Sequence, residues 1–428
     1  MTSLRERFDD AAASPAPPSR LSAAEVYAAA WRRRRVRTGL VAVAGGFTAV
    51  VLVVAVVVGT AGSGRHQETA GPRPSGSSAS PKPSPTGPSG AFVHDGVVLG
   101  ATATDGSHLY AIQAACPTDQ IESCTTDLLG SDDAGQSWTV RSHGIDDLGG
   151  MSVPAPGVLL VGQGKQHIST DGGRTWTALT FSAGARAVQT VAPDGWVACV
   201  SAKTGGCALY AVDPHSGTAR RLAHQPAMAV YSVQHVPVGA GLWVTGSASG
   251  TGHAAVAVSL DHGKTWTTHV FGPGEPDYPT TVSGSETALT ASLDGTTAYT
   301  VVSISMIDET QAREFVYRTD DGGKTWHRTD PRHTLPWAYH GDESYIAADG
   351  THVVASVAGD PAQWYGSRDD GSTYQRPAGV TGLTGLQDMR EAVRVIAPGV
   401  YVAYDTTAVF RSTDGLHWTR LPLPTHPR

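Results

Sequence analysis

The sequence lacks the compact motifs by which many enzymes are recognised. It contains no Gly-rich phosphate loop, no His-Glu-x-x-His and no Gly-x-Ser-x-Gly, and its 17 histidines show no metal-ligand spacing. Its four cysteines are Cys116, Cys124, Cys199 and Cys207, and neither local pair has the Cys-x-x-Cys spacing of a zinc site. We therefore expect no cofactor and no metal ion.

Basic residues are scarce after the first 90 positions. Residues 1–90 contain 11 Lys and Arg against 5 Asp and Glu, whereas residues 91–428 contain 20 against 33. An acidic domain argues against nucleic acid as a partner. It argues equally against simple attraction to anionic lipid or polyanionic glycans.

Charge is absent from Thr38 to Gly64, and Leu40–Val58 consists almost wholly of Val, Ala, Leu and Gly. That length spans a bilayer as a helix, so we predict a transmembrane helix, in contact with lipid, over residues 38–60. The basic run Arg32–Arg35 precedes it, and the positive-inside rule places residues 1–37 in the cytoplasm. A cleaved signal peptide is the alternative, but its apolar core and its leading segment would both be shorter. Because no Cys follows the apolar run, we exclude a lipoprotein anchor.

The segments beside this span complete the predicted topology. Ser22-Ala-Ala-Glu25 has the form of a helix capping box, which predicts a short helix in the cytoplasmic tail. Residues 61–90 are rich in Pro, Ser and Gly and are typical of an extended linker. Residues 91–428 then form the extracellular domain of a single-pass plasma-membrane protein. Paired cysteines in an exported domain favour two disulfides, Cys116–Cys124 and Cys199–Cys207.

One frame, Ser/Thr-x-Asp-x-Gly-x-Ser/Thr-Trp, recurs along residues 91–428. Four copies are complete: Ser131–Trp138, Ser169–Trp176, Ser259–Trp266 and Thr319–Trp326. A fifth copy ends in Tyr374, and a sixth, which ends in Trp418, is one residue shorter. A regular period of a few tens of residues is typical of a solenoid or a propeller.

This frame closely resembles the Asp-box, or BNR repeat, of sialidase-like and sortilin-like proteins. The resemblance implies an all-β fold, a β-propeller in which each box is a hairpin turn of one blade. It also implies that the boxes lie on the face opposite the loops that usually bind ligands. The Ala-, Gly-, Val- and Arg-rich composition is similar to that of a membrane-anchored bacterial member.

The residues of each box have a structural explanation. In Ser169–Trp176, Ser169 and Asp171 can fold their oxygens onto backbone N–H groups of the turn. Gly173 supplies a positive φ, and Trp176 can bury its ring between neighbouring sheets. Six copies of one turn favour a scaffold over six active sites. We assign this structural role to Asp133, Trp138, Asp171, Trp176, Asp261, Trp266, Asp321, Trp326, Asp369, Tyr374, Asp414 and Trp418.

The intervals between the boxes contain apolar runs joined at Gly-containing turns such as Asp194-Gly195 and Asp294-Gly295. Four short strands of this kind make one propeller blade. The double-length interval after Trp176 hides a further unit, whose box has decayed to Asp213-Pro-His-Ser-Gly-Thr218. We predict a seven-bladed β-propeller with units that begin near residues 91, 142, 182, 224, 273, 331 and 379.

Two loops that join consecutive blades carry the candidate ligand-binding residues. Aromatic rings beside carboxylates can bind a sugar or a peptide, and rigid scaffolds present function on such loops. A solvated loop with a few packed aromatics is the alternative. The candidates are Asp277, Tyr278, His333, Trp337, Tyr339, His340, Asp342 and Glu343, with Glu275 beside the first two.

A sialidase-like glycoside hydrolase is the competing hypothesis for function. Resemblance to sialidases implies an arginine triad and a Tyr nucleophile activated by Glu. Residues 91–140 contain no arginine, and Arg420-Leu-Pro422 follows the last box, where it ends an outer strand. The nearest Tyr/Glu pairs in sequence are Tyr317 with Glu314 and Tyr345 with Glu343. We therefore favour a module that binds or senses a glycan, cell-wall or protein ligand.

Overall fold

A computed structural model describes residues 94–116, 125–145, 151–162, 165–182, 184–201, 206–272, 274–275, 278, 284–305, 313–329, 339–356, 363–376, 378–383 and 393–424. Every regular element in these ranges is a β-strand. Within them, no helix has the length and hydropathy needed to cross a bilayer. The predicted cytoplasmic tail, transmembrane helix and linker lie outside the described residues.

The strands form six sheets in the described part of the chain, and four of them are four-stranded antiparallel meanders. The first holds β1 (His94–Ala103), β2 (Leu109–Cys116), β3 (Thr125–Ser131) and β4 (Thr139–His143). The next holds β5 (Met151–Ala155), β6 (Val158–Val161), β7 (His167–Ser169) and β8 (Thr177–Ala178). The other two hold β17 (Gly284–Ala291), β18 (Ala298–Ser305), β19 (Arg313–Thr319) and β20 (His327–Arg328), and β24 (Arg394–Ala397), β25 (Val400–Tyr404), β26 (Val409–Ser412) and β27 (Trp418–Leu421).

The remaining two sheets depart from this meander. One has three strands, β21 (Tyr339–Ile346), β22 (His352–Ser356) and β23 (Gln363–Ser367), and only a single bridge, Gly366 to Gln375, extends its outer edge within the described residues. The other has eight strands: β9 (Thr180–Phe181), β10 (Trp196–Ser201), β11 (Cys207–Asp213), β12 (Thr218–Arg221), β13 (Ala229–Val233), β14 (Leu242–Ser247), β15 (Ala254–Ser259) and β16 (Thr267–Val270). Its halves meet where Cys207 of β11 pairs with Val230 of β13.

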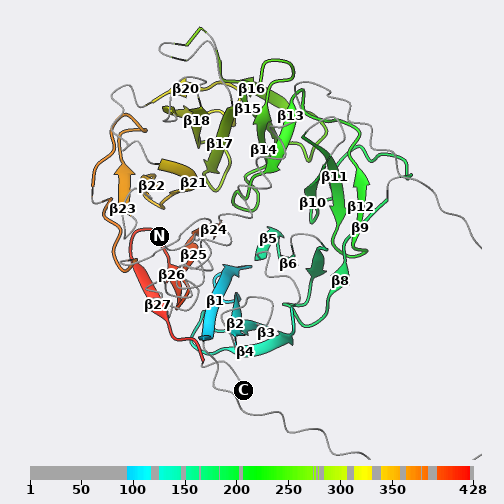
Figure 1. Ribbon diagram of the computed structural model, residues 1–428, viewed down its shortest axis with the longest axis vertical. Helices are drawn as coiled ribbons and strands as arrows, with labels where there is room; N and C mark the ends of the chain where they lie inside the picture. Colours follow the sequence, from blue (N-terminus) through cyan, green and yellow to red (C-terminus); the bar gives the residue numbers. More distant parts are fainter. Residues whose placement is uncertain are drawn as a thin grey trace, which may run out of the picture.

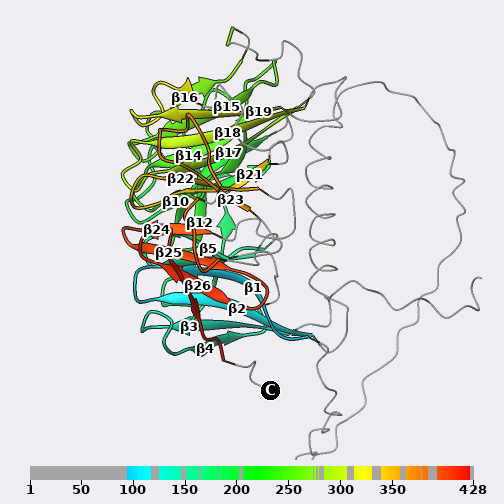
Figure 2. The ribbon, with the colours of Figure 1, turned by 90° about the vertical axis from the view of Figure 1, so that its left-hand side faces the viewer.

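The sheets are arranged around a ring, as Figure 1 shows, and Figure 2 shows them stacked edge-on. The ring closes where the first sheet meets the last, because the Val98 amide donates to the Thr406 carbonyl at 2.9 Å. Val98 and Leu109 are buried there together with Val402 and Val409. The described residues therefore form an all-β propeller, as the sequence predicts.

Apolar side chains fill the spaces between consecutive sheets. Along β15 every residue is buried, and its Val256 and Val258 pack with Val302 and Phe315 of the next sheet. Strands that are covered on both faces read as nearly continuous apolar runs, which explains runs such as Ala254–Val258. Burial of these surfaces supplies the main driving force for closing the ring.

The third predicted unit differs from expectation in its first strand. We expected this unit to begin near residue 182 with the first of four short strands, but Thr180 and Phe181 pair in parallel with the outer edge of β12. Val188 continues this edge, since its amide donates to the Arg221 carbonyl at 2.9 Å. The segment Ser182-Ala-Gly-Ala-Arg186 offers no large apolar side chain to bury inside a blade. The strand count per unit is therefore not uniform, and the number of seven blades stays a prediction.

Candidate functional site

The Asp-box turn is built around one carboxylate. In the second box the Ser169 hydroxyl donates to Asp171 Oδ1 at 2.8 Å, and the Gly173 amide donates to Ser169 Oγ at 2.7 Å. The Thr175 amide and hydroxyl donate to the two Asp171 oxygens at 2.9 and 2.6 Å. Gly173 has a φ of 82°, and an added Cβ would lie 2.2 Å from Leu128 Cδ2. The turn therefore requires glycine both for its backbone and for its packing.

Hydrogen bonding keeps this carboxylate ionised. Burial raises the pKa of Asp171, but hydrogen bonds from Thr175 and Ser169 outweigh burial and lower the pKa to about 2. A carboxylate that accepts several hydrogen bonds is a poor proton donor at neutral pH. The same four contacts recur around Asp133, Asp261, Asp321 and Asp369.

In the shortened sixth box a different side chain contacts the carboxylate. His417 replaces the usual hydroxyl donor, and its Nδ1 lies 2.6 Å from Asp414 Oδ2. In the decayed box the Ser216 hydroxyl donates to Asp213 Oδ2 at 2.8 Å. In every box the carboxylate is thus occupied by its own turn, which supports the scaffold interpretation.

The aromatic residue that follows each box packs between neighbouring sheets to different degrees. Trp418 and Tyr374 are buried, whereas the rings of Trp138, Trp176, Trp266 and Trp326 are half-buried. Trp326 meets Trp243 edge-on at 6.3 Å and Phe271 at 5.7 Å. These aromatics join consecutive sheets, as the sequence predicts for Trp176.

The strand directions define two faces. β11 runs from Cys207 to the decayed box at Asp213, and β15 runs from Ala254 to the box at Ser259. The end of β10, the start of β11 and the end of β16 therefore lie on the face opposite the boxes, which we call the hairpin face. Connecting loops of a rigid scaffold are where binding residues concentrate, so this face is the candidate site.

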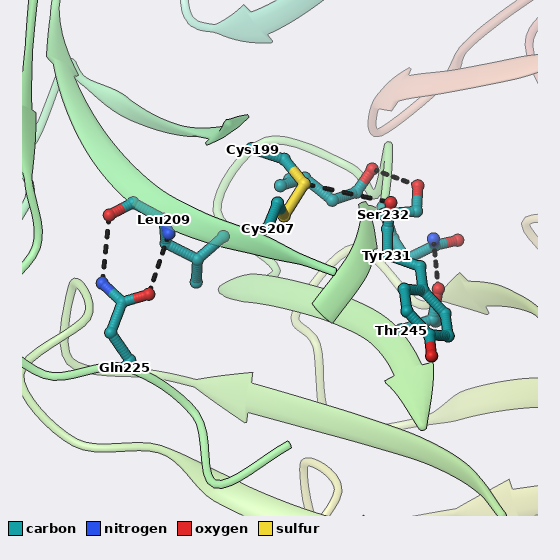
Figure 3. The surroundings of a disulfide bond; sticks show 9 residues. Cys199, Cys207, Leu209, Gln225, Tyr231, Ser232 and Thr245 are labelled. Carbon is teal, nitrogen blue, oxygen red and sulfur yellow. Dashed lines mark hydrogen bonds between the residues drawn. A yellow bond between two sulfur atoms is a disulfide. The ribbon is translucent and has the colours of Figure 1, made fainter. Parts of the chain in front are cut away.

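A disulfide fixes the hairpin face at the junction within the eight-stranded sheet. Cys199 of β10 and Cys207 of β11 are joined, with Cα atoms 5.4 Å apart, as predicted. Figure 3 shows Cys199 Sγ beside the Tyr231 carbonyl oxygen, at 3.9 Å. A disulfide sulfur carries no hydrogen, so we treat this as a packing contact. The second predicted disulfide is Cys116–Cys124. Cys124 lies outside the described residues, so this disulfide stays a prediction.

The Gln225 amide braces the same junction from the other side. Its Oε1 accepts the Leu209 amide at 2.8 Å, and its Nε2 donates to the Leu209 carbonyl at 3.0 Å (Figure 3). The side chain thus takes the place of a neighbouring strand on β11. Together with the disulfide, it holds the start of β11 rigidly.

The predicted ligand-binding residues are only partly visible. Asp277, His333 and Trp337 lie outside the described residues. Four others fall within the bounds of β21, and their side chains are not described: Tyr339, His340, Asp342 and Glu343. Their role stays a prediction.

Tyr278 is described, and its ring is buried between sheets. It stacks on Phe315 at 5.7 Å and meets His253 at 5.8 Å. Burial and the neighbouring Glu275 charge raise the pKa of Tyr278 to about 12. Tyr278 therefore packs in the core, in line with the alternative interpretation of this loop as a solvated segment with a few packed aromatics.

The Tyr/Glu pairs differ from those suggested by proximity in sequence. The Tyr317 hydroxyl donates to Glu275, 42 residues away, and not to Glu314. The Tyr345 hydroxyl donates to the Gly415 carbonyl at 2.7 Å. Tyr317 is only 1% exposed, and burial together with the Glu275 hydrogen bond raises its pKa above the usual value. Sequence proximity could not reveal this pair, because a loop between two sheets delivers Glu275.

Comparison with known proteins identifies the repeat but no close relative. A family model for the BNR/Asp-box repeat matches residues 167–178 and 317–328. No curated protein matches the chain.

Several solved structures are similar in fold. YCF48 from Cyanidioschyzon merolae is 13% identical with a TM-score of 0.42, over 78% of this chain and 97% of that one. An ancestral GH74 enzyme is 13% identical with a TM-score of 0.43, over 75% of this chain and 44% of that one. The α-L-arabinanase of Penicillium chrysogenum, complexed with arabinobiose, is 12% identical with a TM-score of 0.33, over 67% and 82%. At such identities and TM-scores these likenesses carry no argument about ligand or activity.

Proposed function

We propose that this chain is a single-pass membrane protein that displays a seven-bladed Asp-box propeller outside the cell. The propeller acts as a binding or sensing module for a glycan, cell-wall or protein ligand, as a bacterial member of the sialidase-like and sortilin-like group. The arginine run before the uncharged span supports the orientation. The Cys199–Cys207 disulfide is in keeping with an oxidising compartment.

Packing between the sheets supports the number of blades. Seven clusters of buried residues occur among the described residues, and each spans two consecutive predicted units. The last of them in ring order joins the final unit to the first. Seven interfaces between consecutive units are what a closed ring of seven requires.

The rigid hairpin face is the observation that carries the binding function. The disulfide and the Gln225 amide fix the same end of β11. A preorganised surface loses less conformational entropy when it binds a ligand than a mobile surface does. The box carboxylates on the other face are already occupied by their own turns.

A sialidase-like hydrolase is the second candidate, because the Tyr317–Glu275 hydrogen bond resembles a nucleophile with its base. Its surroundings argue against that role. Tyr317 is buried against Phe271, with ring centroids 4.4 Å apart, and the raised pKa disfavours the phenolate that would attack a substrate. We therefore assign this pair to packing between sheets.

A binding screen with turnover measured in parallel tests the proposal. The full chain is offered immobilised glycans, cell-wall fragments and cell-surface proteins, and the soluble phase is analysed for shortened products. We expect saturable retention of one ligand class without products. Release of shorter glycans that is lost in Tyr317→Phe would establish the hydrolase instead.

A further inference from the structure

β13 presents an aromatic ring to solvent on the hairpin face. Tyr231 is 52% exposed, although Val230 beside it is buried. An exposed aromatic side chain of this size forgoes the stabilisation that burial would give. Its position therefore calls for a physical cause.

A β-bulge is that cause. Val230 pairs with Gly246 and Ser232 pairs with Thr245, so the register of β13 and β14 skips Tyr231. A bulge inserts an extra residue into one strand and redirects its side chain, and bulges are frequent beside functional sites. Tyr231 is the inserted residue.

Two further contacts hold the ring in place. The Tyr231 hydroxyl and Ser247 Oγ, at the end of β14, lie 2.8 Å apart. The Tyr231 carbonyl packs against Cys199 Sγ of the disulfide (Figure 3). The first contact holds the tip of the side chain and the second holds the backbone that carries it, while 52% of the residue stays exposed, so a ligand would not have to immobilise it.

We propose that Tyr231 is a stacking platform for a neutral pyranose unit of a glycan. This rests on the proposed binding function and narrows it to one ligand class. The apolar C–H face of a pyranose packs on an aromatic ring, and a sugar hydroxyl can bond to the Tyr231 hydroxyl at its rim, which the buried Ser247 holds in place.

The surroundings favour a sugar over the other ligand classes. Among the described residues, the polar contacts of Tyr231 are with a hydroxyl and a disulfide sulfur, neither of which offers a charge to a sialic acid or a charged peptide. β13 already pairs with β14 and meets β11, so an extended peptide has no free strand edge to join at this bulge.

Calorimetric titration of the full chain with neutral hexasaccharides tests the platform. Cellohexaose, maltohexaose and chitohexaose serve as probes, in a detergent without a sugar headgroup. We expect one of them to bind, and Tyr231→Ala to weaken it about tenfold, the loss expected for an aromatic contact. Phe181, which is 41% exposed on β9, supplies the matched control, and Phe181→Ala should leave binding unchanged.

Removing either partner tests the hydrogen bond between the Tyr231 hydroxyl and Ser247 Oγ. Tyr231→Phe and Ser247→Ala should each weaken binding about two- to threefold, and the double variant should be no weaker than either, because both remove the same bond. Unchanged thermal unfolding of each variant shows that the fold is intact.

Three results would overturn the platform. They are binding of a hexasaccharide with unchanged affinity in Tyr231→Ala, no binding of any hexasaccharide, and loss of a protein ligand alone in Tyr231→Ala. The last would leave the proposed binding function intact while removing the carbohydrate assignment.

Discussion

Trp418 and Trp176 occupy equivalent places after their boxes but differ in burial. Trp418 is 7% exposed and lies edge-on to Tyr345 and Tyr401, at 6.3 and 6.5 Å, whereas Trp176 is half-buried. We predict that Trp418→Ala lowers the free energy of unfolding by about 3–5 kcal/mol. Trp176→Ala should cost clearly less, about 1–2 kcal/mol, because its ring already contacts water. Denaturant unfolding of the two variants gives the comparison, and equal losses would contradict it.

His352 is a buried titratable residue that the sequence did not single out. Its side chain is 0% exposed, stacks on Tyr299 at 4.0 Å, and places Nδ1 2.7 Å from the Tyr374 hydroxyl. Burial lowers the pKa of His352 to about 3. An unfolded chain protonates this ring near pH 6.5 while the folded protein does not.

The stability of the folded protein should therefore fall as pH drops from about 6.5 towards 3. Linkage predicts a loss of about 2 kcal/mol from His352 between pH 6.5 and 4.5. His352→Gln should flatten this slope, because glutamine has no proton to gain in this pH range. The box aspartates act in a lower window, because their folded pKa values near 2 make their contribution disappear only below about pH 4. Denaturant unfolding at several pH values separates the two, and an unchanged slope in His352→Gln would refute the assignment.

At the scale of elements, the β10–β11 hairpin depends on its disulfide. We predict that Cys199→Ser/Cys207→Ser lowers the free energy of unfolding by only about 2–3 kcal/mol, since the cysteines are eight residues apart and close a short loop. Ligand binding should weaken more than the melting temperature suggests, because the hairpin supports the Tyr231 carbonyl. The check is to measure the melting temperature by calorimetry and the ligand affinity on the same sample of the double variant. A global unfolding, or unchanged affinity, would contradict this role.

Sequence reasoning located the strands well where apolar runs sit between Gly turns. The two turns that it named, Asp194-Gly195 and Asp294-Gly295, are followed within three residues by β10 and β18. Near residue 182 it did not reveal the pairing of Thr180 and Phe181 with β12, because no local pattern tells an inner strand from a segment added in parallel to an outer edge.

The candidate site was less accessible to sequence reasoning. The Cys199–Cys207 pairing followed from spacing, but Glu275 reaches Tyr317 only through the arrangement of two sheets. Tyr231 carries no sequence signature, since its exposure depends on the register of β13 and β14. Registers of this kind follow from packing across strands and are weakly encoded locally.

For the whole molecule, the proposed topology predicts opposite protection of its two ends. Under this proposal residues 1–37 lie inside the cell and the propeller outside, because arginines precede the uncharged span. Protease added to intact cells should remove the propeller and leave an N-terminal tag protected. A soluble propeller that begins near Gly64 in the medium would show that the anchor is cleaved.

The central claim is that the propeller binds ligand on the hairpin face and uses the Asp-boxes only as scaffold. Amide hydrogen exchange of the full chain, with and without the glycan or cell-wall fragment retained in the screen, tests it directly. We predict that the ligand slows exchange in the β10–β11 hairpin and in Ala229–Val233, with no change in the turns at Asp171, Asp261 and Asp321. Protection confined to those turns would contradict the account.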